Sequence, residues 1–192
     1  GPLLGEVLLD VGGFQLAWIG GAVLALIATG LALSISETAP ELLPDAPPTP
    51  LLHPAAAGPG LALFTGIVAM GGFLGFVALH ARDVGMDNSA PVLLLFGLVV
   101  VACRIVFARL PDRVQPFRLA VFALAMAAVG LGVVSVFPSV VGLLVGAAIL
   151  AAGVAFITPA VFAAILGRVP AAERGSAMAT ASVFIDLAFG GG

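Results

Sequence analysis

The sequence predicts an all-α membrane protein, built as a bundle of several membrane-spanning helices. Of its 192 residues, 61% are hydrophobic and only 9% are charged, and the mean hydropathy is +1.25. The charged residues gather in short clusters, which leaves long uncharged stretches between them. A chain with so few polar residues cannot cover its own surface in water, so a soluble domain is excluded.

The uncharged stretches define the expected helices, because about 20 apolar residues are needed to cross the hydrocarbon core. Residues 119–167 are too long for one span, and Pro138 divides them, since proline removes a backbone donor. Residues 1–9 and 176–192 are expected to supply parts of two further spans. The predicted full spans lie near 15–36, 60–80, 90–108, 119–137 and 140–166.

Residues 37–59 differ from the rest in composition. They hold three acidic residues, and seven prolines fall between Pro40 and Pro59, a composition that favours extended, solvated chain. We expect a linker here between two helical bundles. Residues 1–36 would then end the first bundle with a half-span and a full span. Residues 60–192 would form the second with four full spans and a truncated fifth.

The distribution of arginine predicts the orientation of the bundle in the membrane. The linker and the loops 109–118 and 167–175 fall on one side by parity. That side carries five of the seven arginines, Arg109, Arg113, Arg118, Arg168 and Arg174, and the other side carries Arg82 alone. Basic loops stay in the cytoplasm, so we expect a multi-pass protein of the plasma (inner) membrane with these loops inside.

Few residues suggest metal, cofactor or nucleic-acid chemistry. Cys103 is the only cysteine, and no CxxC, HExxH or P-loop pattern occurs. The acidic residues are scattered, whereas an intramembrane enzyme would gather them at one membrane face. We therefore expect no metal, no cofactor, no nucleic-acid partner and no enzymatic activity, and the lipid bilayer is the expected partner.

Asp186 is the most informative charged residue. It follows Gly175 by 11 residues, which puts it roughly 16 Å along a helix and near the middle of the bilayer. A carboxylate at that depth is costly unless it is protonated or paired, so a proton-binding role is the functional interpretation. The alternative is a structural acid bonded to a neighbouring helix. We expect Asp186 to point toward the other helices, with a polar group or the water-filled cleft between the two bundles beside it.

Three further side chains are candidates for a substrate cavity. Arg104 lies about one turn from the predicted end of its span, where it either reaches the membrane interface or binds an anionic substrate. Phe73 and Phe76 flank Gly75 in the span 60–80, where aromatic rings serve packing or line a pocket. Glycines four residues apart, such as Gly142 and Gly146, favour close helix packing.

Residues 107–118 read Phe-Ala-Arg-Leu-Pro-Asp-Arg-Val-Gln-Pro-Phe-Arg, between two apolar spans on the arginine-rich side. This loop resembles the cytoplasmic loop motif of the major facilitator superfamily, roughly G-x-L-a-D-R-x-G-R-R. Leu110, Asp112, Arg113 and Arg118 match in type. Ala108 and Gln115 stand where the family has glycine, so the copy is similar to the degenerate one between helices eight and nine.

Two other segments carry the same resemblance. Gly1-Pro2-Leu3-Leu4-Gly5 resembles the end of the helix-five glycine motif of antiporters. Residues 170–175, which include Glu173 and Arg174, resemble the loop that leads into helix eleven. The order of parts is then the end of helix five, helix six, a linker, helices seven to ten and half of helix eleven. We therefore expect a fragment that covers the end of the first half and most of the second half of a twelve-helix, two-bundle transporter.

The resemblance implies alternating access at a site between the two bundles. It implies gating roles for the loop residues Asp112, Arg113, Glu173 and Arg174. The expected function is secondary active transport of a small solute, with a lean toward proton-coupled efflux by drug or sugar antiporters. Its partners would be the solute, protons and the missing N-terminal helices of the same protein. The alternative function is a non-transporting sensor or scaffold with the same helices.

Overall fold

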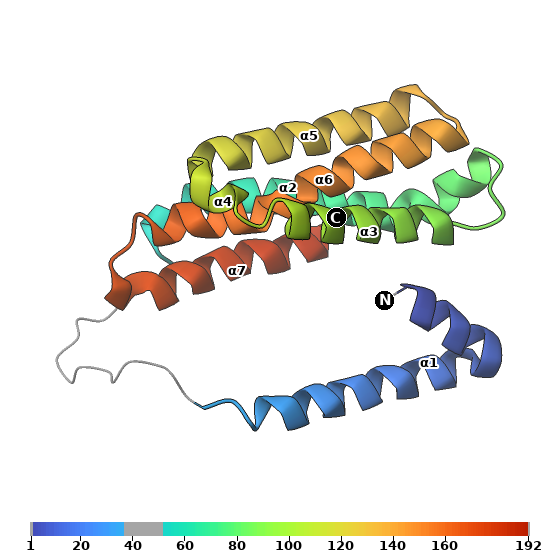
Figure 1. The fold of residues 1–192 in the computed structure, drawn as a ribbon, viewed down its shortest axis with the longest axis horizontal. Helices are drawn as coiled ribbons and strands as arrows, with labels where there is room; N and C mark the ends of the chain where they lie inside the picture. The colour runs from blue at the N-terminus through green and yellow to red at the C-terminus, as the bar shows by residue number, and fades with distance from the viewer. Residues whose placement is uncertain (1, 37–51, 192) are drawn as a thin grey trace. The chain divides into compact units, whose positions relative to one another are not determined.

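The computed structural model describes residues 2–36 and 52–191, and these fall in two compact units, 1–48 and 49–192. Gly1 and residues 37–51 of the expected linker lie outside the described residues. Each unit is considered by itself below. The elements are drawn in Figure 1, and every regular element among the described residues is helical, as the sequence predicts.

The first unit consists of helix α1 (Pro2–Ala32), which is broken at two glycines. Gly12 has φ −145° and ψ 17°, and Gly13 has φ 65° and ψ −167°. The positive φ at Gly13 is easily adopted only by a residue without a Cβ atom. The break lies between the half-span and the full span that the sequence predicts. The helix ends at Ala32, before the expected boundary at residue 36.

The second unit begins with α2 (Pro54–Asp83), which starts six residues earlier than predicted. The expected linker 37–59 is therefore too long at its C-terminal end. Pro54 stands in the first turn of α2. The N–H groups of a first turn have no acceptor within the helix, so the N–H that proline lacks costs no helical hydrogen bond there. Pro59 is also tolerated, because it lies close enough to the helix start to remove only one internal hydrogen bond.

The remaining helices follow the predicted order, with one difference at the third span. These helices are α3 (Ala90–Val106), α4 (Leu110–Arg113), α5 (Pro116–Val136), α6 (Val140–Leu166), the 3₁₀ helix η1 (Ala171–Glu173) and α7 (Arg174–Gly191). The span predicted over 90–108 ends at Val106, and a turn and the short helix α4 continue toward the arginine-rich end. The break between α5 and α6 is at Pro138, where the Ser139 hydroxyl caps α6 by accepting a hydrogen bond from the Gly142 N–H at 3.1 Å.

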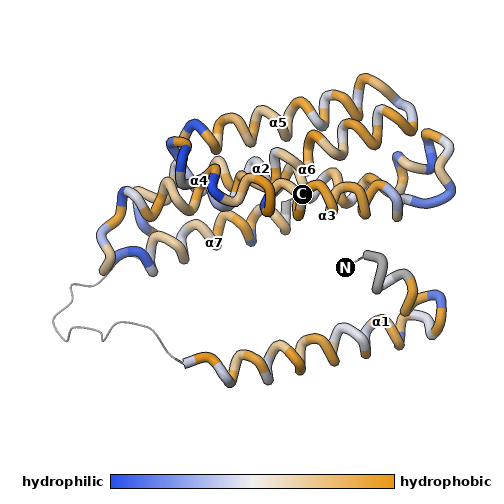
Figure 2. The backbone as a smooth tube through the Cα atoms, viewed as in Figure 1, coloured by the Kyte–Doolittle hydropathy of each residue, from blue (hydrophilic) through white to orange (hydrophobic). Residues whose placement is uncertain are grey.

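Helix α6 is the centre of the second unit. It packs against α5, α3 and α2, while α7 packs mainly against α2. Its buried residues are largely glycine, alanine and branched aliphatic side chains, which let neighbouring backbones come close. Figure 2 shows hydrophobic residues along the helices and hydrophilic residues gathered at the turns of this unit.

Four helical segments in the described part of the chain are long and apolar enough to cross a membrane. They are Val7–Ala32, Pro54–Asp83, Pro116–Val136 and Val140–Leu166. The sequence predicts five full spans, and the fifth, α3, is shorter with 17 residues. At a rise of about 1.5 Å per residue α3 is roughly 25 Å long, so it reaches across the hydrocarbon core only with the turn and α4 that follow it.

Candidate functional site

The end of α3 and the C-terminal half of α6 line an open cavity of about 310 Å³. We call it the Arg104 cavity. Its lining combines one cationic side chain with three phenylalanine rings and a short polar stretch of α6. The lining residues are Arg104, Phe107, Ala108, Ala155, Phe156, Thr158, Pro159 and Phe162.

The polar groups of the Arg104 cavity are free to interact with a ligand. Arg104 forms no ion pair or hydrogen bond with the described residues, and the same holds for the Thr158 hydroxyl. Pro159 lies inside α6 and has no N–H, so the carbonyl of Ala155 lacks its usual helical donor. The rings of Phe107 and Phe156 meet edge to face, with centroids 6.2 Å apart and planes at 70°.

The Arg104 cavity lies deeper than the sequence suggests. Leu166, the last residue of α6, is eight residues beyond Thr158, which corresponds to about 12 Å along the helix. The sequence places Arg104 about one turn from the end of its span, but α3 stops short of the level at which α6 ends. The difference arises because Val106 ends α3 and the chain continues through α4.

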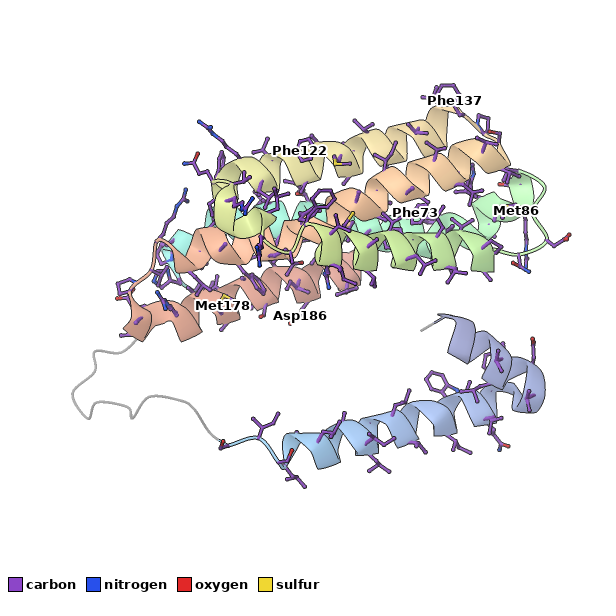
Figure 3. The ribbon with its side chains drawn as sticks, in the orientation of Figure 1. Phe73, Met86, Phe122, Phe137, Met178 and Asp186 are labelled. Atoms are coloured by element: carbon purple, nitrogen blue, oxygen red, sulfur yellow. The ribbon has the colours of Figure 1, made fainter. Side chains whose placement is uncertain are left out.

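Phe73 and Phe76 line a different cavity, of about 600 Å³, between α2, α5 and α6. Phe73 is buried and stacks on Phe96 of α3, with centroids 5.7 Å apart and planes at 20°, and Figure 3 shows it inside the bundle. Phe76 is 66% exposed. His80 and Ser135 are the polar residues of the lining, and Nε2 of His80 is buried without a hydrogen-bond partner among the described residues. The three predicted cavity residues thus belong to two sites.

Asp186 does not point toward the other helices of the second unit. The residues of α7 that are fully buried against the unit are Ala177, Ala181 and Ala188. Successive helical residues are about 100° apart, so Asp186 lies about 180° around the helix from Ala177. It is exposed, and Figure 3 shows it projecting from α7 away from α2 and α6. Among the described residues it has no ion pair or hydrogen bond.

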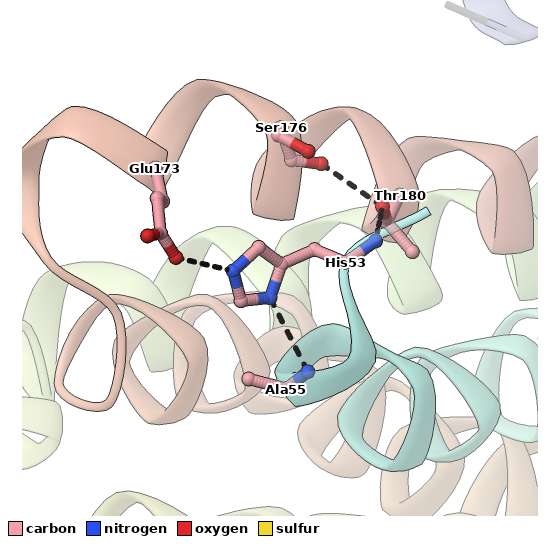
Figure 4. Close-up of polar contacts among 5 residues, drawn as sticks. All are labelled: His53, Ala55, Glu173, Ser176 and Thr180. Carbon is pink, nitrogen blue, oxygen red and sulfur yellow. Dashed lines mark hydrogen bonds and ion pairs between the residues drawn. The ribbon is translucent and has the colours of Figure 1, made fainter. Parts of the chain in front are cut away.

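A polar cluster at the start of α2 and α7 joins residues that the sequence analysis did not connect. The His53 backbone N–H donates to Thr180 Oγ1 at 2.8 Å, and the Thr180 hydroxyl donates to the Ser176 carbonyl at 2.9 Å. The His53 ring lies between Glu173 Oε2, 2.9 Å from Nε2, and the Ala55 N–H, 3.2 Å from Nδ1. Figure 4 shows this arrangement, which we call the His53 cluster.

The His53 cluster fixes the tautomer of the ring. Because Nδ1 accepts the Ala55 N–H, the proton resides on Nε2 and is donated to the Glu173 carboxylate. His53 is thus the N-terminal cap of α2. Thr180 is 2% exposed and the His53 side chain 10%, so the bond between them is shielded from water, whereas the Glu173 side chain is 44% exposed.

The predicted gating residues are not brought together as one group. Glu173 belongs to the His53 cluster, while Arg113 ends α4 and Arg174 begins α7, both exposed. The side chain of Asp112 lies outside the described residues. In the predicted glycine motif, Pro2 begins α1 and nothing lies within 4 Å of a Cβ atom built on Gly5. No group of three or more His, Cys, Asp or Glu residues in the described ranges could hold a metal ion.

The long apolar helices and their packing define an α-helical integral membrane protein. Residues 1–192 match the family model of the Major Facilitator Superfamily, and the chain belongs to that family. This confirms the family that the loop motif predicts.

Curated relatives carry the same family name. The chain is 30% identical over 190 residues to an uncharacterized MFS-type transporter of Salmonella typhimurium, covering 99% of this chain and 49% of the relative. It is 31% identical over 184 residues to uncharacterized MFS-type transporters of Burkholderia mallei and Burkholderia pseudomallei, covering 91% of this chain and 43% of each relative. The chain thus spans about half the length of these relatives. No solved structure gives a significant match.

Proposed function

We propose that this chain is part of a secondary transporter that exports a small solute in exchange for protons, by alternating access between two helical bundles. Membership of the Major Facilitator Superfamily supports transport, and so does the similarity to MFS-type transporters of Salmonella and Burkholderia. The resemblance of residues 1–5 to the antiporter glycine motif supports exchange and export.

The observation that carries the proton coupling is the position of Asp186. Its carboxylate is on the face of α7 opposite the buried alanines and has no partner among the described residues. An ionised carboxylate facing acyl chains at mid-bilayer costs several kcal/mol. This cost is avoided if the face of α7 that carries Asp186 borders a water-filled path between the two bundles.

A carboxylate in such a path has a simple part in exchange. It takes up a proton when the path opens to the outside and releases it when the path opens to the cytoplasm. The neutral acid crosses the low-dielectric stage of the cycle at a lower cost than the anion. Proton uptake then alternates with solute binding, so that inward proton movement drives outward solute movement.

The experiment compares Asp186→Asn with the parent protein in proteoliposomes. An amide cannot exchange a proton, so we expect transport driven by an imposed pH gradient to be lost. Counterflow of solute between two equal pools needs no net proton movement and should persist. Asp87→Asn is the matched control, because Asp87 is an exposed acid in the loop between α2 and α3. This control variant should retain both activities.

Two results would contradict the proposal. Asp186→Asn protein that still moves solute against its gradient, with unchanged pH dependence, would assign Asp186 a structural role. Full-length protein without any counterflow would instead favour the non-transporting sensor or scaffold.

A further inference from the structure

We propose that the Arg104 cavity binds a small amphipathic organic anion, namely an aromatic or otherwise apolar body that carries a carboxylate or sulfonate. The proposal rests on the proposed transport function, and it names the class of solute. It concerns a place within one bundle, between α3 and α6, and four features of that place support it.

The first feature is the charge of Arg104. The described acidic residues include Asp83, Asp87, Glu173 and Asp186, and none of them forms an ion pair with Arg104. Arg104 is exposed on the surface of this unit, so its guanidinium is accessible to an anionic ligand that enters the cavity. Its planar set of donors matches the two oxygens of a carboxylate, or two oxygens of a sulfonate, through paired hydrogen bonds.

The second feature is the apolar wall. Phe107, Phe156 and Phe162 line the cavity, and the first two already meet edge to face. An aromatic ring of a ligand can continue this edge-to-face arrangement, which adds to the free energy of burying its apolar area. A small inorganic anion would leave these rings without a partner.

The third feature is the polar stretch of α6 opposite Arg104. The Ala155 carbonyl, freed by Pro159, accepts a hydrogen bond, and the Thr158 hydroxyl donates or accepts one. These groups lie beside the rings in the same cavity. A ligand with a hydroxyl or amino group on its apolar body therefore finds a partner there, which provides selectivity within the class of organic anions.

The fourth feature is the size and depth of the cavity. Its volume of about 310 Å³ is at the lower end of small-molecule pockets, so it fits a molecule of one or two rings. A phospholipid with two long acyl chains exceeds it. On the α6 side of the cavity, Thr158 lies about 12 Å along the helix from Leu166, the last residue of α6.

The test measures binding, which needs no proton gradient. Full-length protein in nanodiscs of zwitterionic phosphatidylcholine is titrated with 2-naphthoate, 2-naphthalenesulfonate and the neutral 2-naphthamide. We expect the parent protein to bind one or both anions more tightly than the amide. Arg104→Gln should weaken anion binding by about 10- to 100-fold, the range of a charge-assisted hydrogen bond. The same change should leave the affinity for the amide nearly unchanged.

Three variants serve as controls. Arg168→Gln removes an arginine from the loop after α6, outside the Arg104 cavity, and should bind as the parent does. Arg104→Lys keeps the charge and should retain part of the anion affinity, which shows that the site is folded. Phe107→Leu should weaken anion and amide alike by about 3- to 10-fold, because it removes ring contact and no charge.

Several outcomes would overturn the inference. The first is a parent protein that binds neither anion with a Kd below about 1 mM. The second is an anion affinity of Arg104→Gln equal to that of the parent. The third is an equal loss of anion affinity in Arg168→Gln and Arg104→Gln. Loss of naphthoate binding when phosphatidylglycerol replaces a fifth of the lipid would assign the cavity to a lipid headgroup. The binding titration and the gradient-driven transport assay are separate measurements, so a failure of proton coupling is distinguished from a failure of this site.

Discussion

At the scale of single residues, the His53 cluster shows how one position can stabilise two helices. The ring of His53 caps α2 through Ala55, while its backbone N–H and Nε2 bond to Thr180 and Glu173. The bond to Thr180 is the most sheltered of these, because that side chain is 2% exposed. A buried N–H that loses its acceptor keeps the full cost of its desolvation.

We therefore expect Thr180→Val to destabilise the second unit. Valine has nearly the same shape as threonine, so packing is preserved, while the acceptor for the His53 N–H and the hydroxyl donor to the Ser176 carbonyl are lost. The expected cost is about 1–3 kcal/mol, seen as an unfolding temperature lowered by several degrees in detergent. Ser182→Ala is the control, since Ser182 on the same helix makes an exposed bond to the Met178 carbonyl. Equal unfolding temperatures for the two variants would contradict this prediction.

The sequence contains only part of the information for this cluster. A histidine directly before Pro54 is compatible with a helix start, but 127 residues separate His53 from Thr180 and 120 separate it from Glu173. No local pattern links positions so far apart. Their proximity follows from the packing of α7 on α2, which depends on the complete bundle.

At the scale of elements, α5 and α6 approach each other through glycines. A Cβ atom on Gly130 would lie 2.5 Å from the Leu150 nitrogen and 2.8 Å from the Gly146 carbonyl oxygen. A Cβ atom on Gly153 would lie 2.6 Å from the Ala123 carbonyl oxygen. Each of these neighbours is backbone, which cannot move aside as a flexible side chain can. Gly142 and Gly146, paired in the sequence analysis, are both buried at this contact.

We expect Gly130→Ala to separate α5 from α6 and to destabilise the protein by about 1–3 kcal/mol, the usual cost of adding an atom to a packed contact. Gly132→Ala is the matched control on the same helix, where nothing lies within 4 Å of the added atom. There alanine should be neutral or stabilising by up to about 1 kcal/mol, because it favours helix more than glycine does. Thermal unfolding of both variants in detergent measures the difference. A stable Gly130→Ala protein would mean that the two helices pack less closely than described.

The limits of the helices were predictable where a local signal exists. Pro138 and Ser139 define the start of α6, and Pro116 is the first residue of α5. The early start of α2 was missed because the five prolines and three acidic residues between positions 37 and 50 are typical of a linker, although Pro54 suits a first helical turn. The early end of α3 was missed because Phe107 and Ala108 are as apolar as a helix interior, while the turn that they form depends on how α4 packs on α6.

At the scale of the whole molecule, composition and charge spacing sufficed to predict the all-α membrane fold. The family was predicted from a different signal, the resemblance of the loop motif at residues 107–118, and the family model confirms it. The direction of Asp186 was not predictable in the same way. Every face of α7 is rich in small and apolar residues, so periodicity does not distinguish its buried face from the other. The buried face is chosen by the partner helix α2, where Gly60 leaves room for the Phe184 ring.

The orientation of the protein in the membrane is the last prediction, and it rests on the five arginines of one end against Arg82 at the other. We expect the loop between α4 and α5 to face the cytoplasm and the loop between α2 and α3 to face outward. Single cysteines introduced by Gln115→Cys and Asp87→Cys, in a Cys103→Ala background, report on the two loops. Both positions are exposed, and Cys103 lies within apolar α3. A membrane-impermeant maleimide should label Cys at position 87 in intact cells, and Cys at position 115 only after the membrane is opened. The reverse pattern would invert the orientation, and with it the direction in which protons and solute are proposed to move.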